Sequence, residues 1–217
     1  PRQTRFGDKA LRLLKSEIVH CSTLHSALVR THLVARLAHP GGYCSGVLLS
    51  PTTVLTCAHF FRGVDRLVNV YVAGTRRRVK DLEVIAGTDI ALATVSKVRV
   101  DDDTVFPTLG TAPPAFAHTA TFGFGGKLSH PAARDGRFLS TLPFALSRNL
   151  RTVVQPAGVI FNTTPAVKGD SGGPVIADGK VFAVQSLILD PFGVNLGVAT
   201  VSLIDDRVRE SVDKHAR

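Results

Sequence analysis

Short runs of apolar residues, separated by turn-forming residues, follow one another from residue 27 onward. In the first half of the chain these runs cover residues 33–37, 46–49, 51–55, 67–72, 78–85 and 90–95. After the first run the chain reads His-Pro-Gly-Gly over residues 39–42. Proline and glycine there favour the dihedral angles of a tight turn. Six short strands in about 80 residues predict an all-β barrel.

A second series of strand-like runs follows a proline-containing segment at residues 107–117. The runs cover residues 119–122, 152–155, 158–161, 174–176, 181–184 and 196–200. Residues 203–212 then have apolar residues at helical spacing. Asp205 and Asp206 stand near the start of this segment, where a carboxylate interacts favourably with the helix dipole. The sequence therefore predicts a second barrel followed by a C-terminal helix.

These patterns divide the chain into three parts. We expect an N-terminal extension over residues 1–25, the first barrel over residues 26–112, and the second barrel with its helix over residues 113–217. Within the extension, residues 10–15 have the pattern of a short basic amphipathic helix.

Composition is that of a globular chain with a basic surface. Of the 217 residues, 44% are hydrophobic and 20% are charged. No apolar run approaches the roughly 18 residues that a membrane span needs. The net charge is +9, and its densest cluster is Arg76-Arg77-Arg78 beside Lys80. With two tyrosines and no tryptophan, the chain offers no evident stacking platform for bases, so we expect no nucleic-acid partner.

The most distinctive stretch reads Lys-Gly-Asp-Ser-Gly-Gly-Pro over residues 168–174. Ser171 stands between glycines in a predicted turn that precedes a strand. Such a turn exposes the hydroxyl and leaves the backbone amides of Gly169 and Ser171 free to point at one position. An acyl-transfer nucleophile needs this geometry, because the oxyanion that it creates requires two donors beside the attacking oxygen. A glycine-rich surface turn with a chance serine is the simpler alternative.

Two further stretches favour the catalytic interpretation. His59 follows an apolar strand and Asp89 precedes another, although either residue alone is more often structural. Their order along the chain, His59, Asp89, Ser171, is that of the chymotrypsin barrels and differs from that of subtilisin and the α/β-hydrolases. With these segments the chain resembles the trypsin/chymotrypsin-like serine protease family, over most of its length. Its low cysteine count resembles the bacterial type.

The resemblance implies an all-β fold of two six-stranded antiparallel Greek-key β-barrels of the chymotrypsin type, with a C-terminal α-helix. It implies that Ser171 is the nucleophile, that His59 is the general base, and that Asp89 orients His59. The amides of Gly169 and Ser171 then form the oxyanion hole. Because His59 must be neutral to accept a proton, activity should fall on acidification through a pKa of about 6.5–7.

The implied function is that of a secreted serine endopeptidase, which hydrolyses peptide bonds through an acyl-enzyme. Its partners would be protein or peptide substrates and a proteinaceous inhibitor. We expect a monomer with no metal, no cofactor and no membrane span. The alternative is a catalytically silent or zymogen-locked homologue that acts as a binding module.

The resemblance also places a specificity pocket on the acyl side of the scissile bond. Its candidate substrate-binding residues are Pro165, Ala166, Lys168, Ser186, Leu187, Ile188 and Gly197. With Pro165 at the base and Ile188 narrowing the mouth, no carboxylate is expected to meet a basic side chain. Burying an unpaired charge is costly, so we expect small or medium apolar specificity.

Asp170 bears on how the protein becomes active. In the family this aspartate pairs with a new amino terminus, made when the zymogen is cut. Ile18 lies near the corresponding position, but the preceding Glu17 is not a trypsin-like cleavage site. Either an unusual protease cuts before Ile18, or Asp170 has an internal basic partner, as in some bacterial relatives.

The three cysteines, Cys21, Cys44 and Cys57, are an odd number. Secreted members of the family usually carry a disulfide bond beside the catalytic histidine. Cys44 matches one half of that bond, but Phe60 stands where the other half would be. A Cys44–Cys57 bond, a bond from Cys21 to either, and free buried thiols all stay open.

Overall fold

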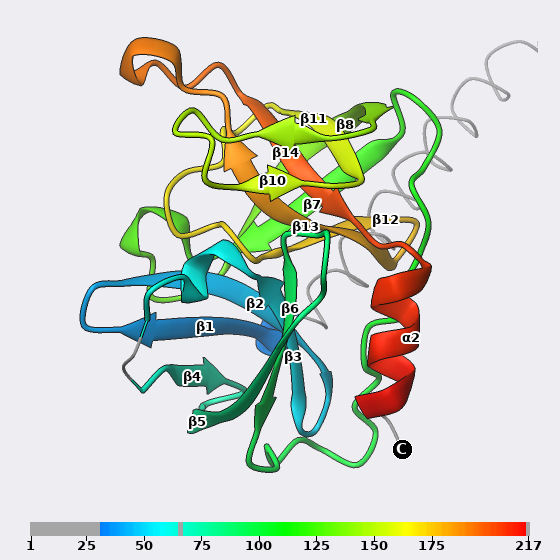
Figure 1. Cartoon of the computed structure of the whole chain (residues 1–217). Helices are drawn as coiled ribbons and strands as arrows, with labels where there is room; N and C mark the ends of the chain where they lie inside the picture. Colours follow the sequence, from blue (N-terminus) through cyan, green and yellow to red (C-terminus); the bar gives the residue numbers. More distant parts are fainter. Residues whose placement is uncertain (1–30, 65–66, 216–217) are drawn as a thin grey trace, which may run out of the picture.

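Two closed β-barrels and a C-terminal helix make up the computed structural model, which describes residues 31–64 and 67–215 (Figure 1). The expectations for residues 1–25, for cleavage before Ile18 and for Cys21 lie outside the described residues. The two six-stranded antiparallel barrels that the sequence led us to expect are confirmed.

The first barrel is formed by the strands β1 (Val34–His39), β2 (Gly42–Ser50), β3 (Thr53–Cys57), β4 (Asn69–Val72), β5 (Thr75–Val84) and β6 (Ile90–Val95). They close in the order β1-β2-β3-β6-β5-β4, and every pairing is antiparallel. The core is filled by side chains such as Leu37, Leu55 and Leu92, which are fully buried. All six strands overlap the runs that the sequence predicted.

The second barrel is formed by β7 (His118–Gly123), β8 (Ala132–Leu142), β11 (Ala157–Asn162), β12 (Pro174–Ala177), β13 (Lys180–Ile188) and β14 (Val198–Leu203). They close in the order β11-β14-β13-β12-β7-β8. The short strands β9 (Ala145–Leu146) and β10 (Val153–Val154) form a separate two-stranded sheet. Residues 96–117 join the barrels, and the expected boundary between residues 112 and 113 falls in this segment.

One barrel strand differs from the sequence expectation. Residues 152–155 were expected to supply it, but they contribute only β10 of the two-stranded sheet. The sixth strand is β8, in which polar, small and apolar residues are mixed and most positions are exposed or partly exposed. Phe138 is its large buried side chain. Because β8 is held by backbone pairing with β7 and β11, it needs no apolar run, and the sequence pattern does not reveal it.

The C-terminal helix α2 (Asp206–His215) contacts both barrels (Figure 1). Asp205 caps it, since its carboxylate accepts a hydrogen bond of 3.2 Å from the backbone amide of Val208. Val208 is fully buried in the core of the first barrel, although the helix follows the last strand of the second. Ser211 donates a hydrogen bond to Glu83 of β5. The helix therefore fastens the end of the chain to the first barrel.

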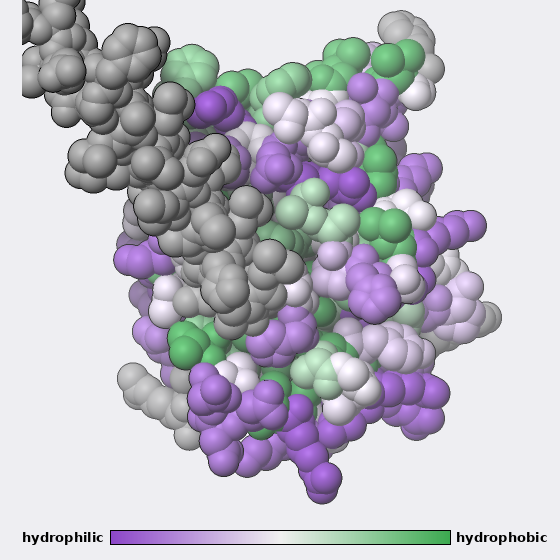
Figure 2. Space-filling model, turned by 180° about the vertical axis from the view of Figure 1, so that it is seen from behind, coloured by the Kyte–Doolittle hydropathy of each residue, from purple (hydrophilic) through white to green (hydrophobic). Residues whose placement is uncertain are grey.

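The rear face of the first barrel is predominantly hydrophilic (Figure 2). Seen from behind, the lower part of the molecule shows mostly hydrophilic side chains, and hydrophobic residues form separate small patches (Figure 2). None of the described helices is long and apolar enough to cross a membrane.

Candidate active site

His59 and Asp89 meet at the end of two paired strands. Strand β3 ends at Cys57, which pairs with Ile90 at the start of β6, so the residues that flank these positions are neighbours. His59 opens the short 3-10 helix η2 (His59–Phe61). Its Nδ1 lies 2.7 Å from Oδ2 of Asp89, and its backbone amide donates to Oδ1 at 2.9 Å. The fully buried carboxylate therefore fixes the orientation of the imidazole ring.

Ser186 of β13 connects this pair to the second barrel. Its hydroxyl donates a 2.6 Å hydrogen bond to Oδ2 of Asp89. Its carbonyl oxygen accepts a long 3.4 Å hydrogen bond from Oγ of Ser171. Ser186 thus contacts both Asp89 and the candidate nucleophile. The contact with Asp89 could not be predicted from the sequence, because no local pattern indicates the partner of a buried serine.

Ser171 and His59 are not joined directly by any hydrogen bond found among the described residues. The Ser171 hydroxyl bonds to the Ser186 carbonyl, and Nε2 of His59 lies 3.8 Å from the sulfur of Cys57. Hydrogen bonds between a base and its nucleophile are often long in unliganded enzymes and tighten when substrate binds. The 3.4 Å bond from the Ser171 hydroxyl to the Ser186 carbonyl is long and therefore weak.

The backbone around Ser171 presents two free amides. The carbonyl of Lys168 accepts from Gly126 and that of Asp170 accepts from Gly173, at 3.2 and 2.9 Å. In a trans peptide the following N–H points the opposite way. The amides of Gly169 and Ser171 therefore point away from these bonds, and neither has a hydrogen-bond partner among the described residues.

Any residue other than glycine at position 169 would strain the backbone. The φ of Gly169 is +103°, a conformation that side-chain-bearing residues rarely adopt, and a Cβ there would overlap the ring of Tyr43. The loop therefore depends on glycine to place the Gly169 amide beside that of Ser171.

Asp170 has an internal partner, Arg134 of β8. Its buried carboxylate accepts hydrogen bonds from the amides of Gly125 and Val167, at 2.7 and 2.9 Å. The Arg134 guanidinium lies 3.2 Å from Oδ2 and is itself mostly buried. Of the two alternatives left open by the sequence, the structure has the internal basic side chain. The sequence could not name Arg134, because β8 was not predicted as a strand.

The surroundings of His59 change its pKa. Burial lowers this pKa, and the hydrogen bonds with Asp89 and Cys57 outweigh burial and raise it to about 10. Burial also raises the pKa of the Cys57 thiol well above its ordinary value, so the thiol is neutral at pH 7. A neutral thiol adds no charge, so at neutral pH the hydrogen bond with Asp89 is the largest cause that raises the pKa of His59, and the hydrogen bond with Cys57 adds to it.

Cys44 and Cys57 are both buried free thiols. Of the arrangements that the sequence left open, a Cys44–Cys57 disulfide bond is absent among the described residues, and a disulfide bond to Cys21 lies outside them. Within the described part of the chain, no three histidine, cysteine, aspartate or glutamate side chains gather in a way that could hold a metal ion.

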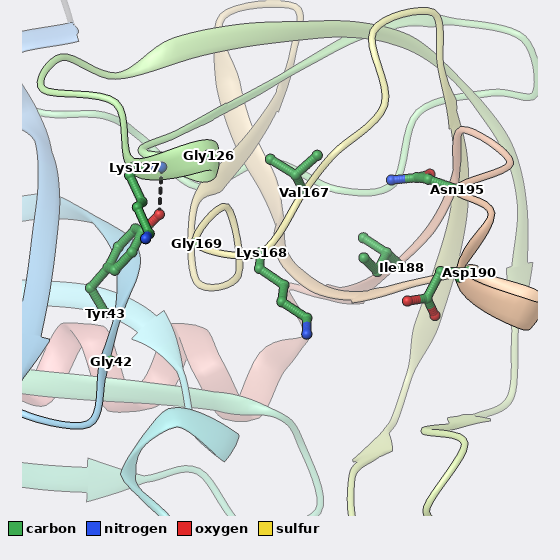
Figure 3. Close-up of a pocket in the computed structure, with 11 residues that line it drawn as sticks. Gly42, Tyr43, Gly126, Lys127, Val167, Lys168, Gly169, Ile188, Asp190 and Asn195 are labelled. Carbon is green, nitrogen blue, oxygen red and sulfur yellow. Dashed lines mark hydrogen bonds between the residues drawn. The ribbon is translucent and has the colours of Figure 1, made fainter.

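A cavity of about 580 Å³ passes the nucleophile loop at Gly169 (Figure 3). One end lies between Gly42, Tyr43 and Lys127, and the other lies between the nucleophile loop and the segment that follows β13. At this second end the lining side chains are Val167, Lys168, Ile188, Asp190 and Asn195. Two of the predicted substrate-binding residues, Lys168 and Ile188, therefore line the cavity.

The other predicted pocket residues lie behind this lining or beside it. They are Pro165, Ala166, Ser186, Leu187 and Gly197, none of which lines the cavity. Asn195 explains the difference, because its amide donates to the carbonyl of Ala166 at 2.6 Å and accepts from the amide of Gly197 at 3.0 Å. This bridge joins two of the predicted pocket residues, Ala166 and Gly197. Asp190, which the sequence did not place among the pocket residues, also lines this cavity.

Two antiparallel barrels with this loop between them define the class of trypsin-like serine peptidases. A family model described as a trypsin-like peptidase domain matches residues 44–184, which is more than half of the chain. The chain belongs to the trypsin-like peptidase family. No curated protein matches it in sequence.

Solved structures show the same fold at low sequence identity. The active form of the Rv3671c protease from M. tuberculosis is 19% identical, with a TM-score of 0.69 over 87% of this chain and 83% of that chain. Kallikrein-related peptidase 10 in complex with Zn²⁺ is 16% identical, with a TM-score of 0.68 over 87% and 97%. Human heparin binding protein is 14% identical, with a TM-score of 0.66 over 86% and 92%.

Proposed function

We propose that this protein is a serine endopeptidase that uses Ser171, His59 and Asp89 as its catalytic triad. The observation that carries the proposal is the buried Asp89 carboxylate, which binds His59 through two hydrogen bonds beside a loop with two free amides. A trypsin-like fold implies peptide substrates, and this arrangement supplies a nucleophile, a base and an oxyanion hole.

The reaction follows from the roles of these groups. Oγ of Ser171 attacks the carbonyl carbon of the scissile bond while Nε2 of His59 takes the hydroxyl proton. The amides of Gly169 and Ser171 donate to the oxyanion. His59 then returns the proton to the leaving nitrogen, the C–N bond breaks, and an acyl-enzyme forms. Water, deprotonated by His59, hydrolyses the ester and regenerates Ser171.

The remaining parts of the proposal rest on the family resemblance. They are secretion, a monomeric state and inhibition by a proteinaceous inhibitor. A catalytically silent binding module is not favoured, because the chain keeps all three triad residues and the glycine that the oxyanion hole requires. A zymogen lock is not favoured either, because Asp170 already has a basic partner.

A fluorophosphonate probe tests this proposal directly. We expect covalent labelling of Ser171 in the wild-type protein, and loss of labelling in Ser171→Ala and in His59→Ala. Ser171→Ala should lower kcat by about 10⁵–10⁶-fold, as the loss of the nucleophile does in related chemistry. If the folded protein is not labelled either before or after limited proteolysis, the proposed catalytic function is wrong.

A further inference from the structure

The cavity beside the nucleophile loop has charged residues at both ends. Lys127 lies with Tyr43 at one end, and Asp190 lies beside Ile188 at the other (Figure 3). Lys168 extends from the loop between them. Among the described residues these three charged side chains form no ion pair with one another or with any other group. The cavity therefore has free charges to offer a ligand.

The proposed chemistry determines which end of the cavity binds the leaving part of the substrate and which end binds the acyl part. His59 must hand its proton to the leaving nitrogen, so the leaving part of the substrate lies on the side of the first barrel. Gly42 and Tyr43 belong to β2 of that barrel. The acyl part then lies along the second barrel, toward Ile188 at the end of β13 and the segment behind it. The Asp190 end is therefore the acyl-side pocket.

The entrance to this pocket suits an unbranched aliphatic chain. Val167 and Ile188 approach from its two sides (Figure 3). Ile188 leaves little width for an aromatic ring, but the methylene groups of a lysine or arginine side chain are narrow and pack on apolar surface while the charged end continues. Asn195 is a weaker partner for a cation than a carboxylate, because its oxygen is neutral and already accepts from the amide of Gly197.

Asp190 supplies the one carboxylate among the described residues that line the cavity. It is half-buried, and its side chain forms no hydrogen bond with the described residues, including the amides of the 3-10 helix η4 (Pro191–Gly193) that follows it. A partly desolvated carboxylate without a partner gains most from a charged donor, since such bonds are about twice as strong as neutral ones. Lys168 is exposed and does not satisfy it.

We infer that Asp190 is a specificity-determining residue that selects a lysine or arginine side chain on the acyl side of the scissile bond. The inference rests on the proposed peptidase function and replaces the apolar preference expected from the sequence. Lys168, at the rim, opposes a basic side chain by like-charge repulsion and so moderates the preference.

A peptide library with one varied acyl-side residue, profiled by mass spectrometry, tests the inference. The wild type should cleave lysine and arginine substrates best. Asp190→Asn should lower kcat/KM for these substrates by about 10- to 100-fold, the effect of losing a hydrogen bond to a charged group. Its kcat/KM for alanine and leucine substrates should fall much less, so the ratio of basic to apolar cleavage should drop. Lys168→Gln should raise kcat/KM for basic substrates.

A matched control is Asp178→Asn, since Asp178 lies in a different groove and is exposed. It should leave the profile unchanged. An equal ratio of basic to apolar cleavage in the wild type and in Asp190→Asn would overturn the inference while labelling still supports the peptidase. Absence of labelling would overturn the peptidase proposal itself, so the two failures are distinguishable.

Discussion

At the scale of single residues, His59 differs from an isolated histidine in having two hydrogen-bonding neighbours. Asp89 holds Nδ1 and the Cys57 sulfur lies 3.8 Å from Nε2, the nitrogen that must accept the Ser171 proton. The two contacts together keep the protonated imidazole favourable in spite of burial. The neutral base is therefore less populated at pH 7 than the sequence alone led us to expect.

The pH dependence of activity should report this difference. The pKa of His59 is raised to about 10, so kcat/KM should rise with pH through a midpoint well above the ordinary value of about 6.5. The stability that the folded His59–Asp89 pair contributes is fully present below about 6.5 and is lost as pH rises through the raised pKa. The measurement is a pH–rate profile on a substrate whose chemistry is rate-limiting. A midpoint at or below 6.5 would contradict the raised pKa.

Substituting Cys57 separates its effect from that of Asp89. Cys57→Ala removes the contact at Nε2, so the acidic limb of the same profile should move to lower pH. Cys44→Ala is a second arm, because Cys44 is also a buried free thiol that bonds to Thr56 and to Cys57 but not to His59, so it should move the limb less than Cys57→Ala does. An unchanged limb in Cys57→Ala would mean that the thiol does not act on His59.

At the scale of elements, strand β8 supplies the residue that holds the nucleophile loop in shape. Arg134 reaches from β8 to Asp170, the neighbour of Ser171, and also contacts the carbonyl of Gly125. The loop is thereby fixed from within the second barrel. An amino terminus created by cleavage is not needed for this contact.

Arg134→Ala should damage both stability and turnover. It leaves the buried Asp170 carboxylate without its counter-charge, which typically costs about 3–5 kcal/mol. The loop that carries the Gly169 amide should loosen, and loss of one oxyanion donor lowers kcat by about 10²–10³-fold. Steady-state kinetics and urea unfolding measure the two effects, with Arg134→Lys expected to restore part of each.

Arg137→Ala is the matched control on the same strand, because Arg137 is exposed and bonds only to the carbonyl of Phe116 among the described residues. It should lower neither kcat nor stability appreciably. The kcat of Arg134→Ala is to be measured at a temperature at which the variant is folded. A wild-type kcat under these conditions would mean that Arg134 does not shape the nucleophile loop.

The cap of α2 gives a second prediction at this scale. Asp205→Ala removes the carboxylate that accepts from the Val208 amide, so the free energy of unfolding should fall by about 1 kcal/mol. Asp206→Ala is the control, since Asp206 is exposed and makes no such bond. Urea denaturation measures both, and equal losses would contradict the capping role.

At the scale of the whole molecule, the sequence predicted the barrels and the triad because both depend on local signals. Apolar runs bounded by turns identified eleven of the twelve barrel strands, and three short motifs singled out His59, Asp89 and Ser171 as the candidate triad, of which the structure joins His59 and Asp89 by hydrogen bonds. The features that it did not predict are long-range contacts between polar residues. The Arg134–Asp170 pair spans 36 residues and the Ser186–Asp89 bond spans 97, and no periodicity marks either.

The residues that line the pocket could also be predicted only in part from the sequence. Ile188 could be placed by counting along β13, because a strand has a fixed rise per residue. Asp190 and Asn195 follow the strand in an irregular segment around η4, where side-chain directions depend on each turn. Only the folded structure therefore reveals the bridge from Asn195 to Ala166 and Gly197, and the Asp190 carboxylate at the cavity.

The two barrels share a core as well as a candidate active site. Val181 and Val184 of β13, with Ile204 and Val208 near the C-terminus, are buried in one cluster with the side chains of the first barrel. Removing either barrel would expose this cluster to water. We therefore expect the barrels to unfold together, in one cooperative transition.

The distribution of aromatic residues allows this to be tested with probes in separate barrels. Both tyrosines, Tyr43 and Tyr71, lie in the first barrel, and the chain has no tryptophan. Phe161→Trp, at a partly exposed position of β11, would place a distinct fluorophore in the second barrel. The urea midpoint from tyrosine emission of the wild type should equal the midpoint from tryptophan emission of the variant. Far-ultraviolet circular dichroism of both proteins measures any change in stability that the substitution itself causes, and this change is subtracted. Leu55→Ala, in the first barrel, should lower both midpoints equally, because burying leucine there contributes about 2–5 kcal/mol to one shared transition. A tryptophan midpoint that stays in place while the tyrosine midpoint falls would show that the barrels unfold independently, and that the shared cluster does not couple them.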